Sequence, residues 1–130
     1  MPELEILRPE CAPVPIGPYS SMIRAGDTIW GSALAGVNPT TGVLVGRTSY
    51  EQSAQALRLI AGMLEEVGSG LSQVVSVTVF LKDVADFGEM NRAYVEAFGT
   101  HEPTRSVISV VDLPKAGALL TMNFVAVSID

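Results

Sequence analysis

The chain has 130 residues, enough for one domain that buries about two-thirds of the surface of its unfolded chain. Hydrophobic residues make up 48% and charged residues 17%, which excludes an intrinsically disordered chain and leaves little polar surface for a lone monomer. The net charge is −6 and the 8 basic residues are scattered singly, so no basic stripe marks nucleic acid as a partner.

Nothing in the sequence points to secretion, a membrane or a disulfide. Residues 1–10, MPELEILRPE, carry three glutamates and no apolar core, so a signal peptide is not expected. No apolar run reaches the ~18 residues of a membrane-spanning helix. The single cysteine, Cys11, cannot form an internal disulfide, and no cation lies beside it to activate the thiol. We therefore expect one cytoplasmic domain over residues 1–130.

The first third of the chain predicts turns and short strands. Residues 9–20 hold four prolines and are expected to be irregular. Residues 21–36 predict a hairpin that turns at Ala25–Gly26–Asp27. Residues 37–46, VNPTTGVLVG, predict a second turn in which Gly42 adopts a positive φ.

Two amphipathic helices are predicted next. Ser49 and Gln52 form a capping-box pattern, and Gly68 is placed to end the first helix. Asp86 and Glu89 repeat the capping pattern before the second helix. The expected apolar stripes are Tyr50, Ala54, Leu57, Ala61, Leu64 and Val67 in the first helix, and Phe87, Met90, Tyr94, Ala97 and Phe98 in the second.

Residues 74–81, 105–111 and 119–129 are rich in β-branched and apolar residues and predict three further strands. In the first of these, alternation places Val75, Val77, Val79 and Leu81 on one face. The resulting order, ββαβαβ(β), predicts an α+β fold with a mixed sheet of four to six strands and two helices. Right-handed crossovers would place both helices on the same face of that sheet.

The other face of the predicted sheet is not polar enough for water. In the last strand, Leu119, Val125, Val127 and Ile129 point one way, and Leu120, Met122, Phe124 and Ala126 point the other. A sheet with one solvated face should carry polar residues there, and an exposed apolar patch normally marks an interface. We therefore expect a homo-oligomer that buries the uncovered face.

Most searches for a catalytic motif are negative. The lone histidine, His101, follows a helix and favours a solvated loop side chain over a catalytic base. One histidine and one cysteine are too few for a zinc site, and no glycine-rich phosphate loop followed by lysine occurs. Trp30 is expected to pack rather than to bind a ligand. We predict neither a metal nor a cofactor.

Arg105 is the exception, because it stands at the start of a neutral apolar strand. Pro103 fixes the chain just before it, and no carboxylate follows until Asp112. Strand-end arginines often extend into solvent, so surface decoration is the alternative interpretation. A guanidinium at the rim of a buried sheet, however, is suited to holding a small carboxylate with two parallel hydrogen bonds.

The segments PIGPYS, VNPTTG, VVSVTVFLKDVADFGEMNRAYVEAFG and EPTRSVISVVDLPK together resemble, in order and spacing, the RidA/YjgF-type (Rid) family. The resemblance runs from Ala12 to the end of the chain. It implies a chorismate-mutase-like α+β fold and a homotrimer with clefts between its subunits. It also implies cofactor-independent hydrolysis of reactive enamines and imines, such as 2-aminoacrylate, to 2-oxo acids and ammonia.

The resemblance assigns roles to individual residues. Arg105 matches the arginine that binds the substrate carboxylate, Tyr19 matches a tyrosine that lines the cleft, and Asn91 matches a helix asparagine near it. Ser32 stands where a serine commonly precedes a backbone segment that faces the ligand. Val107 replaces a position often held by cysteine, whose role runs largely through its backbone.

One departure concerns the group that activates water. Deaminating members usually carry a glutamate in the last strand, whereas no carboxylate lies between Lys115 and Asp130 here, and Asn123 is the best match. An amide can hold water but cannot accept its proton, so we expect a general-base contribution of about 100-fold or more to be missing. Ala33–Leu34 is also more apolar than the Gly-Gln usual in the family.

Two functions follow as hypotheses. The first is hydrolytic deamination of an enamine or imine, in which Arg105 holds the carboxylate, Tyr19 shapes the cleft and Asn123 positions water. The second is a non-catalytic trimer of the same fold that binds a small carboxylate or serves as a regulatory partner. A variant that acts on a bulkier imine is a further possibility, and an endoribonuclease role is less favoured because the chain is acidic.

Overall fold

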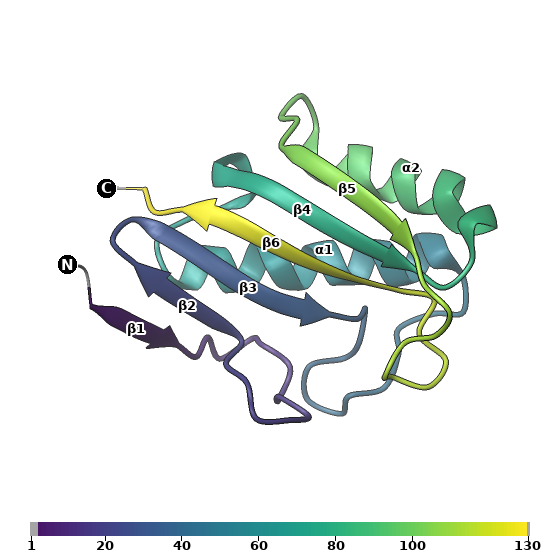
Figure 1. The fold of residues 1–130 in the computed structure, drawn as a ribbon, viewed down its shortest axis with the longest axis horizontal. Coiled ribbons are helices and arrows are strands. Elements are labelled where there is room, and N and C mark those ends of the chain that lie inside the picture. Colours follow the sequence, from purple (N-terminus) through teal and green to yellow (C-terminus); the bar gives the residue numbers. More distant parts are fainter. Residues whose placement is uncertain (1–2, 130) are drawn as a thin grey trace.

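A mixed six-stranded sheet with both helices on one face makes up the fold (Figure 1). The computed structural model describes residues 3–129. The helices are α1 (Ser49–Glu66) and α2 (Phe87–Phe98), with short 3-10 turns at Leu71–Gln73 and Val84–Asp86. The strands are β1 (Leu4–Leu7), β2 (Met22–Ala25), β3 (Thr28–Leu34), β4 (Val74–Leu81), β5 (Thr104–Ser109) and β6 (Leu120–Val127).

The strands lie in the order β1-β2-β3-β6-β4-β5. β4 and β5 run parallel, as their connection through α2 requires, and the other neighbouring pairs run antiparallel. The predicted α+β class, the mixed sheet and the placement of both helices on one face are confirmed. β5 and β1 form the two edges of the sheet, which lie on opposite sides of the molecule in Figure 1.

β1 is the element that the sequence reasoning did not place. It is four residues long and pairs with β2 at the edge of the sheet. Three of its residues are exposed, so no apolar periodicity reveals it. The hairpin of β2 and β3 is confirmed, as is the later turn, where the Gly42 amide donates to the Asn38 carbonyl at 2.7 Å with Gly42 at φ 75°.

The N-terminal cap of α1 lies one residue before the predicted position. Thr48 is the N-cap: its hydroxyl accepts from the Glu51 amide at 3.1 Å, and the Glu51 carboxylate accepts from the Thr48 amide at 3.2 Å. The predicted pair, Ser49 and Gln52, is buried, and its side chains bond other segments instead of capping the helix. Ser49 donates to Glu89 of α2 at 3.0 Å, which ties the two helices together.

The buried face of α1 is also wider than predicted. Leu57 and Leu64 are buried as expected, whereas Tyr50, Ala54 and Ala61 are partly exposed in a shallow groove beside α2. The helix packs against both the sheet and α2, so its buried arc is rotated away from the predicted stripe. The residues that are buried in it are Ser49, Gln52, Ser53, Ala56, Leu57, Leu59, Ile60, Met63 and Leu64.

The start of α2 also differs from the prediction, because a 3-10 turn precedes the helix. The chain enters α2 through the 3-10 turn at Val84–Asp86, so Asp86 already has helical φ and ψ and makes no side-chain cap. Asp83 instead accepts from the Ala85 amide at 2.9 Å. Within the predicted stripe Met90, Tyr94 and Phe98 are buried, whereas Phe87 and Ala97 are exposed.

A β-bulge reverses the predicted faces at the start of β4. Val74 pairs with Ala126 and Ser76 pairs with Val125, so β4 holds one extra residue at this point. Val74 is therefore buried with Val77, and Val75 is exposed, contrary to the alternation read from the sequence. From Val77 onward the predicted alternation is confirmed.

The core lies between the helices and one face of the sheet. In β6 the buried residues are Leu120, Met122, Phe124 and Ala126, as the alternation predicts for one side of the strand. The opposite side of the sheet, which we call the open face, carries residues from all six strands, among them Ile6, Ile23, Trp30, Asn123, Thr78 and Ser106. Among the described helices, none combines the length and the apolar character needed to cross a bilayer.

Candidate functional site

Arg105 lies on the helix-covered side of the edge strand β5. Its register partner is Val77, which is fully buried under the helices. The guanidinium carbon lies 4.7 Å from the ring centroid of Tyr94 and 5.5 Å from that of Phe87, and Nη1 donates to the Asn91 side-chain oxygen at 2.7 Å. The sheet edge and α2 therefore fix the guanidinium plane, and Arg105 and Asn91, two of the residues that the family resemblance assigns to the site, are in direct contact.

No carboxylate neutralises this arginine among residues 3–129. The ion pairs in the described part of the chain join Arg24 to Glu5 and Lys82 to Asp112, each at 3.5 Å. A guanidinium carries five N–H donors, so Arg105 keeps donors for a ligand after bonding Asn91. Partial exposure at the sheet edge leaves it accessible to a small anion.

Val107 and Tyr94 complete the surroundings of Arg105. Val107 follows two residues later on the same side of β5, pairs with Val79 and is partly buried. Burial raises the pKa of Tyr94, and the nearby Arg105 charge opposes that shift. The Tyr94 hydroxyl is buried and has no hydrogen-bond partner within the described chain. The sequence placed Tyr94 in an apolar stripe and did not assign it to the site, although its position three residues after Asn91 puts both on one face of α2.

Tyr19 and Ser32 belong to a second group of residues at a cavity of about 780 Å³. The Ser32 hydroxyl donates to the Ser20 carbonyl at 2.7 Å, and its amide donates to the Ser21 carbonyl at 3.0 Å. Ser32 therefore fastens the segment that carries Tyr19 to β3. The Tyr19 hydroxyl accepts from the Ile16 amide at 3.3 Å, which turns its ring along the proline-rich segment and leaves it 45% exposed.

Asn123 lies on the open face, opposite a second β-bulge. Gly31 pairs with Phe124 and Leu34 pairs with Met122, so residues 32–33 bulge where Asn123 faces them. On its other side Asn123 pairs with Thr78 of β4. Thr121, two residues earlier on the same face, lines the cavity together with Tyr19 and Ser32.

The cavity also includes residues that the sequence reasoning did not assign to the site. The proline-rich lead-in forms one wall, and the connection between β5 and β6 contributes Pro114 and Lys115. The clustered prolines are the signal that could have found the first wall, because such a segment presents a rigid apolar surface. The full lining is Pro13, Val14, Pro15, Ile16, Tyr19, Ser21, Ser32, Ala33, Leu34, Ala35, Val37, Pro39, Thr40, Thr41, Gly42, Met63, Pro114, Lys115 and Thr121.

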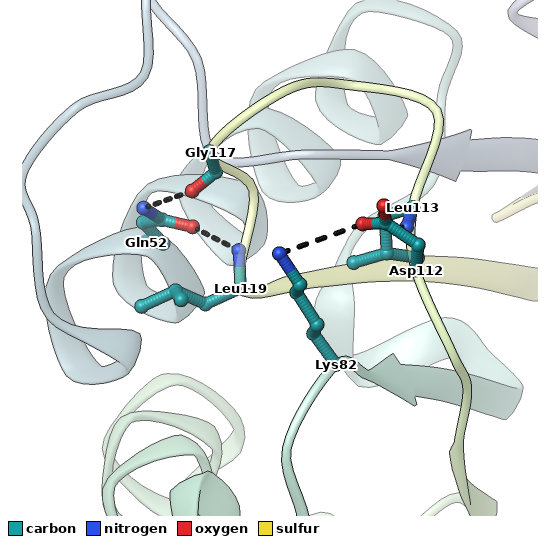
Figure 2. A network of polar contacts seen from close by, with 6 residues as sticks. All are labelled: Gln52, Lys82, Asp112, Leu113, Gly117 and Leu119. Carbon is teal, nitrogen blue, oxygen red and sulfur yellow. Dashed lines mark hydrogen bonds and ion pairs between the residues drawn. The ribbon is translucent and has the colours of Figure 1, made fainter.

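A buried amide holds the connection between β5 and β6 in place (Figure 2). The Gln52 side-chain oxygen accepts from the Leu119 amide at 2.8 Å, and its nitrogen donates to the Gly117 carbonyl at 3.5 Å. Nearer the start of the connection, Asp112 forms the ion pair with Lys82. The residues between these two anchors, including Pro114 and Lys115, are thereby fixed at the cavity wall.

One subunit does not bring all predicted site residues together. Arg105, Asn91 and Val107 lie at the β5 edge on the helix-covered side, whereas Asn123 lies on the open face. β6 and β4 stand between β3 and β5, which separates Ser32 from β5 by three interstrand spacings, about 14 Å. No three- or four-carbon acid spans that distance and also crosses the sheet.

Cys11 and His101 make contacts within the fold and lie outside the candidate site. The Cys11 thiol lies against α1, and burial, together with a hydrogen bond to the Glu66 carboxylate, raises its pKa to about 11. A thiol in that state is not a nucleophile at neutral pH. His101 Nε2 lies 2.7 Å from the Val74 carbonyl oxygen, so its ring fastens the connection after α2 to β4.

The chain is similar in sequence to a known protein family and to several of its members. The sequence profile described as Endoribonuclease L-PSP matches residues 9–128. A RutC family protein from Pyrococcus abyssi is 41% identical over 122 residues, which cover 94% of this chain and 95% of that protein. A 2-iminobutanoate/2-iminopropanoate deaminase from Capra hircus is 38% identical over 106 residues, covering 82% of this chain and 77% of the relative.

Solved structures agree with the sequence comparison. The crystal structure of E. coli TdcF with bound serine superimposes with a TM-score of 0.89 at 29% identity, covering 96% of this chain and 99% of that one. The motifs, the strand order and the matched length all indicate the same family. The chain belongs to the Endoribonuclease L-PSP family, that is, to the RidA/YjgF-type proteins that its motifs resemble.

Proposed function

We propose that the protein hydrolyses 2-imino acids, and the enamines from which they form, to 2-oxo acids and ammonia without a cofactor. The observation that carries the proposal is Arg105, a guanidinium held by Asn91 and two aromatic rings with no carboxylate partner among the described residues. The names of relatives such as the Capra hircus imine deaminase support the reaction class. The serine bound to TdcF supports an amino-acid-like ligand.

In this reaction the enamine first takes up a proton at its terminal carbon and becomes an iminium. Water then adds to the iminium carbon and one of its protons passes to nitrogen. The C–N bond breaks and ammonia leaves as the C=O bond forms, and ammonia takes up the remaining hydroxyl proton to become ammonium. Arg105 holds the carboxylate, Tyr19 shapes the cleft, and the Ser32–Ala33 bulge presents backbone near the ligand. Asn123 positions the water but accepts no proton, so catalysis rests on orientation of an already electrophilic iminium.

The site is proposed to form between subunits of a homotrimer. Within one chain Arg105 and Asn123 occupy opposite faces of the sheet, so one small substrate reaches both groups only when they come from different subunits. The open face carries exposed apolar residues such as Trp30 at 48% and Ile6 at 49%, which an assembly would cover. A neighbouring subunit would then place its β5 edge beside the cavity.

A second function is a trimer that binds a small carboxylate without catalysis. The observation in its favour is the amide of Asn123, with Thr121 beside it, where a proton acceptor would be expected for efficient hydrolysis. The retained pairing of Arg105 with Asn91 serves binding and catalysis equally.

The two functions are separated by an assay with 2-aminoacrylate or 2-aminobutenoate, generated in situ by a dehydratase. We expect wild type to accelerate oxo-acid formation and Arg105→Ala to lower kcat/KM by about 100-fold or more, because charge-assisted bonds to the carboxylate are lost. Asn123→Glu should raise kcat toward that of a protein with a general base. A wild-type rate equal to that of buffer, together with measurable binding of the oxo-acid product, would establish the binding function instead.

A further inference from the structure

The cavity beside Tyr19 is larger than the smallest substrates require. Its volume of about 780 Å³ lies in the range of sites for drug-sized molecules, roughly 300–1,000 Å³. In one subunit, before a neighbouring β5 edge is added, a three-carbon imino acid would leave most of this space empty. The cavity therefore has room for a longer side chain on the substrate.

One wall of this cavity is apolar and presented to solvent. Val14 and Ile16, in the proline-rich segment, are each 75% exposed. Leu34 from β3 and Pro114 from the β5–β6 connection add apolar surface to the same cavity. Prolines limit the freedom of the first segment, and Gln52 fixes the second (Figure 2). The wall is thus formed before a ligand arrives.

The charge of the lining fits a substrate with one acidic group and an uncharged side chain. Lys115 is the single charged residue in the lining, and no carboxylate from residues 3–129 contributes to it. Such a site attracts anions and offers no partner for a basic side chain. Its remaining polar side chains all end in hydroxyls, namely those of Tyr19, Ser21, Ser32, Thr40, Thr41 and Thr121.

From these three observations, and resting on the proposed function, we infer that the site selects 2-imino acids with large apolar side chains, branched or aromatic, over those with three or four carbons. The carboxylate binds Arg105 of the neighbouring subunit, and the side chain lies against Leu34, Val14 and Ile16. Each methylene buried there contributes about 0.8 kcal/mol, which is roughly fourfold in kcat/KM. Leu34 is the specificity-determining residue at the centre of this contact.

The test uses imines made in situ by an L-amino-acid oxidase from leucine, phenylalanine and alanine. Hydrolysis is followed by the loss of semicarbazone formation at fixed semicarbazide. We expect kcat/KM for the leucine- and phenylalanine-derived imines to exceed that for the alanine-derived imine by about 10- to 100-fold. Leu34→Gln should reduce this ratio by about tenfold, and Val14→Ser, at an exposed position outside β3, should also reduce it.

Ile129→Gln is the matched control, because it makes an apolar-to-polar change beyond the far end of β6 from Thr121. Equal efficiency for all three imines, or a preference for the alanine-derived one, would overturn the inference and leave the proposed function intact. Acceleration of none of the imines would remove the proposed function itself. A Leu34→Gln variant that loses activity equally on all imines, with Val14→Ser unchanged, would assign Leu34 to structure and refute the apolar wall.

Discussion

Arg105 is a charged residue whose surroundings are almost entirely uncharged. Its guanidinium lies over Tyr94 and Phe87 and bonds the amide of Asn91, so aromatic faces and one neutral oxygen hold a full positive charge. Such contacts orient a cation without cancelling its charge. An anion that reaches this edge of the sheet therefore meets a guanidinium that is already oriented and has no carboxylate partner among residues 3–129.

Tyr94 leads to a prediction about stability. Its hydroxyl is buried with no partner in the described chain, and an unsatisfied buried donor costs about 1–3 kcal/mol. We expect Tyr94→Phe to leave the free energy of unfolding unchanged or to raise it by about 1 kcal/mol, measured by urea denaturation. A destabilised Tyr94→Phe protein would show that the hydroxyl has a partner outside the isolated subunit. Tyr94→Leu also removes the ring from under Arg105, so it should lower the free energy of unfolding whether or not the hydroxyl has such a partner.

Cys11 leads to a prediction about reactivity. With a pKa of about 11, its thiolate is scarce at pH 8, so we expect Cys11 to react with a disulfide reagent about 100-fold more slowly than a free thiol. Glu66→Gln removes the hydrogen-bonded carboxylate and should raise the rate, since less negative charge opposes thiolate formation. Glu65→Gln, whose carboxylate acts only through its charge, should raise it less. A thiol that reacts rapidly in wild type at pH 8 would contradict the burial.

At the scale of elements, α1 shows how two overlapping signals compete. Thr48 with Glu51, and Ser49 with Gln52, both satisfy the capping-box pattern. The structure uses the first pair, because a carboxylate accepts backbone bonds more strongly than an amide and because Gln52 is buried between two loops. Gly36 lies against the same turn of α1: a Cβ there would stand 2.1 Å from the Gln52 carbonyl oxygen.

The cap predicts a pH dependence. Backbone N–H groups of Arg47 and Thr48 lower the pKa of Glu51, so its contribution to stability is complete above the unfolded-state pKa of about 4.3 and is lost as pH falls through the lower folded-state pKa. We expect Glu51→Ala to lower Tm at pH 7 and the difference from wild type to shrink below about pH 4. Thr48→Ala should cost about 1 kcal/mol. Glu102→Ala, in an exposed loop, serves as the control.

The sequence predicts the elements better than it predicts their faces. Periodicity reveals α1, α2 and β4 because their buried residues recur at regular steps. The two β-bulges leave no such signal, since each inserts one residue into an otherwise ordinary strand. The bulge before Ser76 reverses Val74 and Val75, and the one after Gly31 places Asn123 opposite two residues of β3.

The arrangement of the candidate site could not be predicted from the sequence. The family resemblance assigns Arg105, Asn91 and Tyr19 to the site, whereas the hydrogen bond between the first two was not predicted and appears only in the structure. That Arg105 lies under α2 while Asn123 lies on the open face depends on strand register, which the sequence does not specify. The role of Ser32 in fastening the segment before β2 likewise appears only from its contacts.

At the scale of the whole molecule, the division of the site between two faces predicts complementation between subunits. In the proposed homotrimer, the Arg105→Ala and Tyr19→Ala variants should each have low activity on their own. Unfolding the two together and refolding them as mixed trimers should restore about a quarter of the wild-type activity, because a quarter of the interfaces then combine an intact Arg105 with an intact Tyr19. The measurement is oxo-acid formation before and after mixing, with size followed by light scattering. No recovery in mixed trimers would place both residues in one subunit's site.

The placement of Arg105 and Asn123 on opposite faces of the sheet also affects how activity depends on the concentration of the chain. If the reacting groups meet only where two subunits are in contact, an isolated subunit is inactive. The specific activity then depends on protein concentration through the assembly equilibrium. Halving the chain concentration near the dissociation constant of the assembly would then lower the total activity by more than half. Progressive dilution of the purified protein would show this as a falling rate per chain.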